Sequence, residues 1–353
     1  MFRPRTGLID FISLDKFTAS LVSGRPVSPQ GSSLKALELA KSWIDFCFDN
    51  HSKCQWSSRS EDPCLPTRVI DVVTLHNDSV LLVLSQGMCG KWAALSHRWG
   101  IRPFFTLRKD TIHSLKTRIP VASLPTTFQD AIKLTRFLGL KYLWIDSLCI
   151  LQDSVADWAA EASTMPRVYQ NAYVTIAAAA TEDSYGGIFV EKAWAKVSMP
   201  CALPVKSQND EGTVTIDLPL DHGLEHEEIN YLKKRAWCFQ EARLSYRVLT
   251  FDRLQMSYTC LNHGLLESRD LPEGAAREEK NPFLLKLHSA TRKDDQTKNR
   301  ELLSTWYQAI ADYTLRSLTF QQDKLVAIAG MARIVGGFLK DEYSAGLFHR
   351  TLP

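Results

Sequence analysis

The sequence has none of the signals that direct a protein into or across a membrane. Its 353 residues contain no stretch of about 20 consecutive apolar residues, the length needed to span a bilayer. The N-terminal residues 1–5 are not followed by the apolar core of a signal peptide. We therefore expect a cytoplasmic protein without a membrane-spanning segment.

An excess of charge of one sign is also missing. The 42 Lys and Arg residues nearly balance the 39 Asp and Glu residues, which leaves a net charge of +3. Nonspecific binding to nucleic acid requires a concentrated positive field, so nucleic acid is not an expected partner. With 45% hydrophobic and 23% charged residues, the chain is predicted to fold into one large domain or two smaller ones.

Cysteine is sparse as well. Eight cysteines in so long a chain fall far below the density of a disulfide-stabilised scaffold, and we expect most of them to be thiols. Four of them lie in or beside apolar runs, which suits small core residues: Cys89, Cys149, Cys238 and Cys260.

Two kinds of binding motif are weak or absent. Cys47, His51, Cys54 and Cys64 are four possible zinc ligands, but Cys-x3-His-x2-Cys is not one of the usual paired spacings. We therefore predict no metal site. The sequence also has no glycine-rich phosphate loop, because residues 186–187 alone indicate a turn.

From residue 92 onward, short apolar runs alternate with helical segments, which is typical of an α/β domain with a parallel sheet. The expected strands are residues 92–96, 142–146, 172–180 and 246–251. The expected helices are residues 124–138, with Thr126 or Thr127 as N-cap and Gly139 as stop, residues 154–169, with Ser154 as N-cap, and residues 235–244.

The organisation of the chain follows from these segments. Residues 1–90 are predicted to be an N-terminal extension with a helix at 34–48 and a hairpin formed by 66–73 and 80–84. Residues 91–255 form the core, interrupted by an irregular insertion at about 190–232 with one strand at 213–218. Residues 256–353 form a C-terminal helical extension, with a charged connector at 270–298 and helices at 302–315 and 323–338. Since the chain ends without a polar tail, we expect it to be the front of a longer protein.

Three segments of the core carry a family resemblance. Residues 94–100 read Ala-Leu-Ser-His-Arg-Trp-Gly, residues 124–132 lead into the Tyr-Leu-Trp-Ile-Asp-Ser-Leu-Cys-Ile-Leu-Gln-Asp run of 142–153, and residues 235–245 read Arg-Ala-Trp-Cys-Phe-Gln-Glu-Ala-Arg-Leu-Ser. In content, order and spacing they resemble the fungal heterokaryon-incompatibility (HET) domain. His97 departs from the Tyr-Cys or similar pair that family members often carry before Trp-Gly.

The same segments resemble, more distantly, those of TIR domains. In plant-type TIR domains a first strand ends in Leu-Ser-Phe-Arg-Gly and a second in Ile-Asp-Asp, and the catalytic glutamate lies in a Trp-Cys-Leu-x-Glu-Leu helix. Here residues 95–98, 144–146 and 237–241 occupy the corresponding places in the same order. The resemblance implies a TIR-like, flavodoxin-like parallel sheet flanked by helices.

The resemblance also implies a function. HET-domain proteins act in nonself recognition and programmed cell death, and TIR enzymes cleave NAD between nicotinamide and ribose. We therefore expect a cell-death effector with NAD glycohydrolase activity, NAD as substrate and no prosthetic group. A homo-oligomer on activation and a partner incompatibility protein are the further partners that the resemblance suggests.

Two carboxylates are the predicted catalytic residues. Glu241 shares a helix face with Trp237 and Leu244, where a carboxylate is either functional or paired with an arginine such as Arg235. Asp146 follows a central strand at the edge where α/β sheets bind ligands, and its alternative role is to cap the following turn.

The predicted NAD-binding residues follow the first core strand or lie in the other matching segments. Arg98 suits a phosphate, and tryptophan rings suit stacking on a flat base, although such tryptophans are also common in cores. His97 could act as an acid or base, or as a structural hydrogen-bonding group. The full set is Ser96, His97, Arg98, Trp99, Trp144 and Trp237.

Two other functions remain open at this point. The same residues could form a non-enzymatic surface for homotypic assembly in nonself recognition. Alternatively, the fold could serve as an enzyme of small-molecule biosynthesis, with a closed apolar pocket in place of a dinucleotide crevice.

Overall fold

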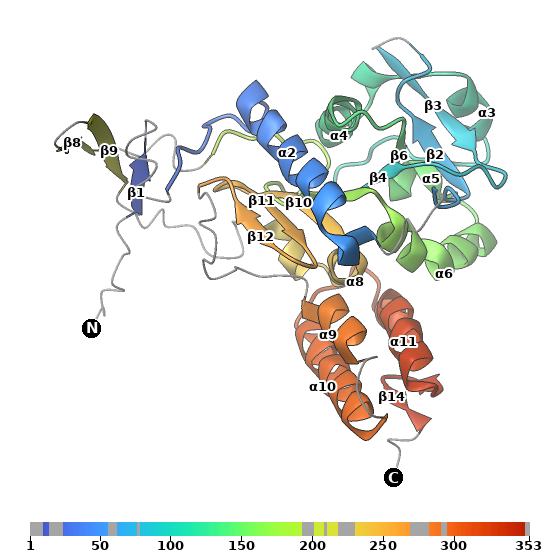
Figure 1. Ribbon diagram of the computed structural model, residues 1–353. Coiled ribbons are helices and arrows are strands. Elements are labelled where there is room, and N and C mark those ends of the chain that lie inside the picture. The colour runs from blue at the N-terminus through green and yellow to red at the C-terminus, as the bar shows by residue number, and fades with distance from the viewer. Residues whose placement is uncertain are drawn as a thin grey trace, which may run out of the picture.

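The computed structural model describes residues 10–13, 24–55, 62–75, 78–192, 201–207, 210–217, 230–268, 282–290 and 295–349. It confirms an α/β fold, with a nine-stranded sheet flanked by helices (Figure 1). No helix among these residues is both long and apolar enough to cross a bilayer.

Four parallel strands form the centre of the sheet, in the spatial order second, first, third, fourth of their sequence order. This is the order of flavodoxin-like doubly wound sheets, in which ligands bind at the carboxyl ends of the strands. The four strands, in spatial order, are β6 (Tyr142–Trp144), β4 (Trp92–Ser96), β7 (Val174–Ala178) and β10 (Arg247–Phe251).

The expectation of a parallel sheet is correct only for this centre, because the complete sheet is mixed. Strands from both predicted extensions, together with the short strand Ile119–Pro120 of the predicted core, add to its edges in antiparallel orientation. They cover backbone groups that the three-residue β6 and the terminal β10 would otherwise expose. These strands are β2 (Arg68–Asp71), β3 (Ser79–Leu84) and β5 (Ile119–Pro120) beside β6, and β11 (Met256–Cys260) and β12 (Gly264–Leu266) beside β10.

The helices lie close to their predicted positions. Ser154 caps its helix as expected, through a hydrogen bond from the Asp157 N–H, whereas Pro125 stands at the N-cap where Thr126 or Thr127 was expected. Gly139 has a φ of +75°, which suits its role as stop. The helices are α2 (Leu34–Asn50), α3 (Ile112–Thr117), α4 (Thr126–Phe137), α5 (Asp146–Cys149), α6 (Val155–Asn171), α8 (Ala236–Leu244), α9 (Pro282–Ala290), α10 (Asp295–Thr314) and α11 (Val326–Leu339).

The irregular regions contain more regular structure than the sequence predicts. The strand predicted at 213–218 is β9 (Glu211–Asp217), and the insertion also contributes β8 (Cys201–Lys206), which was not predicted. These two strands form a separate antiparallel sheet with β1 (Asp10–Ser13). Residue 218, the predicted end of the strand in the insertion, lies outside the described residues. The charged connector contains α9, whose apolar residues pack in the core. A short hairpin of β13 (Tyr343–Ser344) and β14 (Leu347–Phe348) follows α11.

A buried ion-pair cluster joins the N-terminal hairpin to the core. The guanidinium of Arg68 on β2 contacts Asp157 at 2.6 Å and Glu161 at 3.2 Å, both on α6. Its Nε also donates to the Cys149 carbonyl at 2.6 Å. Asp157 in turn accepts a hydrogen bond from the Leu151 N–H at 2.8 Å, so this cluster fixes the loop between α5 and α6.

Helix α8 lies against the sheet and is covered by α6 and α11 (Figure 1). At this junction Gly330 of α11 allows close approach, since a Cβ there would collide with the Pro166 ring of α6 and the Gln240 side chain of α8. Gly337, on the same helix, has no atom within 4 Å of the place where its Cβ would be.

We expect Gly330→Ala to lower the free energy of unfolding by about 1–3 kcal/mol, because overpacking outweighs the better helix propensity of alanine. The matched control, Gly337→Ala, is expected to raise it by about 0.5–1 kcal/mol, because alanine favours the helix and has room there. Denaturant unfolding of both variants measures the difference, and equal effects would contradict the close packing at Gly330.

Candidate functional site

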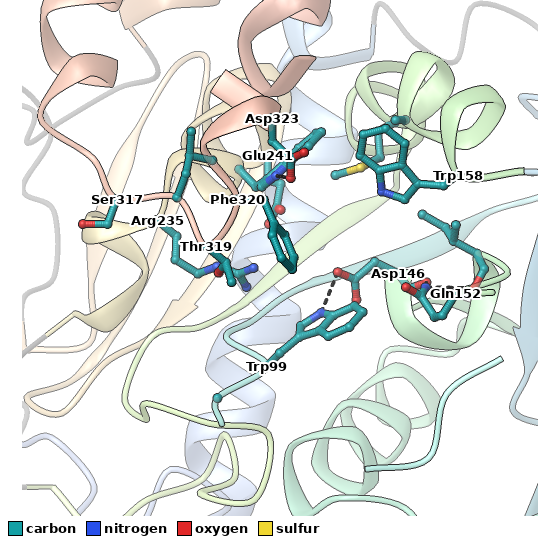
Figure 2. A pocket seen from close by; sticks show the side chains of 16 residues that line it. Trp99, Asp146, Gln152, Trp158, Arg235, Glu241, Ser317, Thr319, Phe320 and Asp323 are labelled. Carbon is teal, nitrogen blue, oxygen red and sulfur yellow. Dashed lines mark hydrogen bonds between the residues drawn. The ribbon is translucent and has the colours of Figure 1, made fainter. Parts of the chain in front are cut away.

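A pocket of about 260 Å³ opens at the carboxyl ends of β4 and β6. Side chains from the loops after both strands line it, together with α8 and the segment 317–323 that precedes α11. Figure 2 shows Ser317, Thr319 and Phe320 on one side of the pocket and Asp146 and Gln152 on the other. The pocket therefore lies at the edge where doubly wound sheets bind ligands.

Glu241 of α8 is a buried carboxyl group in the pocket wall, with only 5% of the residue exposed. Burial raises its pKa to about 7, against lowering effects of Ser96 and Arg235 and a further raising effect of Asp146. Its Oε2 has no hydrogen-bond partner among the described residues. A buried carboxyl group near half ionisation at neutral pH, in the wall of a pocket, suits acid–base or electrostatic catalysis.

No arginine forms an ion pair with Glu241 among the described residues. Arg243 pairs instead with Asp312 at 3.3 Å, and Arg247 donates to the carbonyls of Tyr173 and Cys54. Arg235 acts on Glu241 through its charge without direct contact. The alternative of a paired carboxylate therefore has no direct ion pair among the described residues, although Glu241 and Arg235 stabilise each other through their charges.

Asp146 begins α5 and is held in a fixed orientation. Its Oδ2 accepts a hydrogen bond from the Trp99 indole N–H at 2.8 Å, drawn as a dashed line in Figure 2. Its Oδ1 accepts one from the Ser147 backbone N–H at 2.7 Å, so the side chain also contributes to the first turn of α5, although Ile145 stands at the N-cap. Since Asp146 also lines the pocket, this role in the turn and ligand binding are compatible.

Arg235 supplies the positive charge of the pocket. Its Nη1 donates to the His97 carbonyl at 2.7 Å, which fixes the guanidinium between the β4 loop and α8. Burial acts to lower the pKa of Arg235, but Cys238, Glu241 and Asp146 raise it above its ordinary value. The described lining of the pocket thus combines three carboxyl groups, those of Asp146, Glu241 and Asp323, with one permanent cation.

Aromatic side chains form much of the remaining wall. Trp158 and Trp237 meet edge to face, with ring centroids 6.5 Å apart, and the Trp237 indole N–H donates to Asp323 at 3.3 Å. Trp99 and the 61% exposed Phe320 also line the pocket. Flat rings around a polar floor suit a ligand that contains a planar heterocycle.

The predicted site residues fall into three groups: those that line the pocket, those that lie behind it, and those that lie elsewhere. Trp99, Asp146, Trp237 and Glu241 line the pocket. Ser96 and His97 lie behind it: Ser96 interacts with Glu241, and the His97 Nδ1 is 3.9 Å from the Asp146 Oδ1. Burial lowers the pKa of His97 to about 4, so its imidazole is neutral near pH 7.

Arg98 and Trp144 are not among the residues that line the pocket. Trp144 is fully buried in the core, where its ring contacts that of Tyr169 edge to face. Arg98 is half-buried, and its carbonyl accepts a hydrogen bond from Ser184. The role of cation in the pocket therefore falls to Arg235, where the sequence pointed to Arg98.

Sequence reasoning missed several residues of the pocket, chiefly Arg235, Gln152, Trp158, Phe320 and Asp323. Arg235 and Gln152 belong to the matching segments, so these segments could have indicated them. The segment 317–323 carries no recognisable signal. It reaches the pocket because Ser317 exchanges backbone hydrogen bonds with Lys234 and Ala236, at 2.6 and 3.0 Å.

A second cluster of chemically active side chains lies outside the pocket. Cys47, His51, Cys54 and Cys260 are all buried, and their potential ligand atoms lie within 4.8 Å of one another. Cys64 is not part of it, because its Sγ lies 3.5 Å from that of Cys89. Three of the four potential zinc ligands considered from the sequence therefore do meet, with Cys260 in place of Cys64.

Comparison with known families finds a match for one part of the chain, which contains most residues of the pocket. The family model described as heterokaryon incompatibility protein (HET) matches residues 92–241, from the first residue of β4 to Glu241. No curated protein and no solved structure matches the chain, so the likeness to TIR domains stays a prediction. The chain carries a HET domain at residues 92–241.

Proposed function

We propose that this protein acts in heterokaryon incompatibility as a cell-death effector, and that its pocket hydrolyses NAD to nicotinamide and ADP-ribose. The observation that carries the proposal is the buried Glu241 carboxyl group. Its pKa is raised to about 7, and it faces a pocket that also holds Asp146, Arg235 and three tryptophans. Groups with such perturbed pKa values concentrate at functional sites.

The reaction needs few protein groups. The bond between the ribose C1′ and the nicotinamide nitrogen breaks, and its electron pair goes to the nicotinamide, which leaves as a neutral molecule. The positive charge passes to the ribose as an oxocarbenium ion, which water attacks at C1′ with loss of a proton. A carboxylate beside the ribose stabilises this ion and orients its hydroxyl groups, and Glu241 is the group suited to this role.

The pocket offers a partner for each part of the substrate. Trp99, Trp158 and Trp237 provide flat surfaces for the nicotinamide ring. The oriented Asp146 can accept hydrogen bonds from ribose hydroxyls, and Arg235 can bind the pyrophosphate. A volume of about 260 Å³ suits the nicotinamide riboside half of NAD, with the adenosine half extending over the rim.

We expect Glu241→Gln to lower the release of nicotinamide from NAD at least about a hundredfold, the scale of losing a group that stabilises transition-state charge. Chromatography of nicotinamide after incubation of purified protein with NAD measures it. The assay is run at high protein concentration with a crowding agent, since the activity is expected to require self-association.

Glu267→Gln is the matched control for this experiment. Glu267 is equally buried, at 5% exposure, and accepts hydrogen bonds from the backbone N–H groups of Ser28 and Met256 away from the pocket. It is expected to keep the activity. No nicotinamide from the wild-type protein under any of these conditions overturns the enzymatic proposal. Cell killing that survives in Glu241→Ala would instead favour a non-enzymatic assembly module.

Trp99→Phe tests the role of the hydrogen bond to Asp146. The change keeps an aromatic ring in the pocket but removes the indole donor, so the Asp146 carboxylate keeps only its hydrogen bond from the Ser147 N–H and is less firmly oriented. A hydrogen bond to a charged group contributes about 1.5–3 kcal/mol, so we expect kcat/KM for NAD to fall by roughly 10–100-fold. An unchanged kcat/KM would show that the orientation of Asp146 does not matter to the reaction.

The raised pKa of Glu241 also predicts how stability depends on pH. Between its ordinary pKa of 4.5 and its folded value of about 7, the folded state binds more protons than the unfolded state. The free energy of unfolding therefore falls as the pH rises through this range. The amide introduced by Glu241→Gln mimics the protonated acid, so this variant should match the wild type below pH 4.5 and exceed its stability by about 3 kcal/mol above pH 7. Thermal and denaturant unfolding at about pH 4, 6 and 8 test this, and a constant difference across the series would contradict the raised pKa.

A further inference from the structure

Four metal-binding side chains meet where the C-terminal end of α2 lies against the β11–β12 hairpin. Cys47 belongs to the last turn of α2, His51 is its C-cap, and Cys54 lies in the short 3-10 helix Ser52–Gln55. Cys260 ends β11, more than 200 residues later in the chain. All four lie outside residues 92–241, the part of the chain that matches the HET family.

We propose that Cys47, His51, Cys54 and Cys260 bind one zinc ion in a closed tetrahedral site. Three cysteines and one histidine form one of the usual ligand sets of structural zinc. Each of the four side chains is buried, with at most 5% of the residue exposed. A buried group of four such ligands has no place for water, which distinguishes a structural site from a catalytic one.

The distances agree with this geometry. With Zn–S bonds of about 2.3 Å and Zn–N bonds of about 2.0 Å, tetrahedral ligand atoms lie about 3.5–3.8 Å apart. The Sγ of Cys260 and the Nδ1 of His51 are 3.6 Å apart, and no pair of ligand atoms is more than 4.8 Å apart. The space between the ligands fits a single ion, and it is too small for an iron–sulfur cluster.

The groups around the cysteines favour thiolate sulfurs. The backbone N–H groups of Asn262 and His263 donate to the Sγ of Cys260, at 3.4 and 3.3 Å. The buried Tyr258 hydroxyl lies close enough to Cys47 to interact with it, but it has no hydrogen-bond partner of good geometry among the described residues. Hydrogen bonds of this kind orient metal ligands and stabilise their negative charge.

Charge balance gives an independent argument. Zinc with three thiolates and a neutral imidazole carries a net charge of −1, which needs a nearby cation in a buried site. Arg247 is 2% exposed, and its Nη1 donates to the Cys54 carbonyl at 2.7 Å. No carboxylate of the described residues forms an ion pair with Arg247, so the zinc–thiolate group is the anion that would compensate this buried guanidinium.

The site would connect the two segments that flank the HET domain. Cys47, His51 and Cys54 precede the domain and Cys260 follows it, so a bound ion would link α2 to β11 across the edge of the sheet. Because such a site forms only in the folded chain, its binding free energy adds to the stability of the fold.

The test is metal analysis of the purified protein. We expect about one zinc ion per chain by plasma mass spectrometry, the stoichiometry of a closed four-ligand site. Protein produced in cobalt-supplemented medium should show the strong visible d–d and thiolate charge-transfer absorption of tetrahedral Co²⁺. Both measurements use the wild-type chain, so they do not depend on the folding of a variant.

Cys260→Ser and Cys64→Ser form the matched pair of variants. Cys64 is exposed and outside the cluster, so Cys64→Ser should keep the metal and the cobalt spectrum, whereas Cys260→Ser should lose both. Chelation should lower the melting temperature of the wild type and of Cys64→Ser. A wild-type protein that folds without metal and shows no tetrahedral cobalt spectrum overturns the proposal, as does iron in place of zinc.

Discussion

The placement of the site depends on the close packing of α8. This helix of nine residues carries Trp237 and Glu241 and begins directly after Arg235, so its position sets three groups of the pocket at once. It is held between the sheet and the pair α6 and α11, where the absence of a side chain at Gly330 lets the helices approach. Burial of Glu241, and hence its raised pKa, follows from this packing, since desolvation is the main cause of the shift.

The family match covers less of the molecule than the site requires. Residues 92–241 contain β4, β6, β7 and most of α8, but the pocket is completed by the segment 317–323. The sheet extends on both sides into strands outside that range, and Arg68 on β2 holds the loop that carries Ile150 and Gln152 through Asp157. The flanking segments therefore take part in forming the sheet and the pocket.

Features that depend on neighbouring residues in the sequence could be predicted, whereas contacts between segments far apart in the sequence could not. Strand 92–96 and the helix capped by Ser154 follow from local apolar patterns and capping, and both are confirmed. The hairpin of β2 and β3 was also predicted locally, but its attachment to β6 pairs segments about 70 residues apart in the chain, which no local pattern encodes. The same holds for the site: Asp146 and Glu241 could be named from their motifs, while Phe320 could not, because a backbone pairing near Arg235 brings it to the pocket. The sequence indicates Arg98 as the cation of the pocket because this residue follows a core strand. The direction of the Arg98 side chain, however, cannot be predicted from the sequence.

The charges of the pocket relate the proposed reaction to the protonation of Glu241. Asp146 raises the pKa of the buried Glu241, and a cationic ligand in the pocket would act in the opposite direction. The oxidised nicotinamide ring of NAD is such a cation, so its binding would favour the ionised form of Glu241, the form that stabilises the oxocarbenium ion. Once the bond breaks, the nicotinamide is neutral and no longer favours the ionised form of Glu241. By linkage, the carboxyl group can therefore take up a proton again after this step of the proposed reaction.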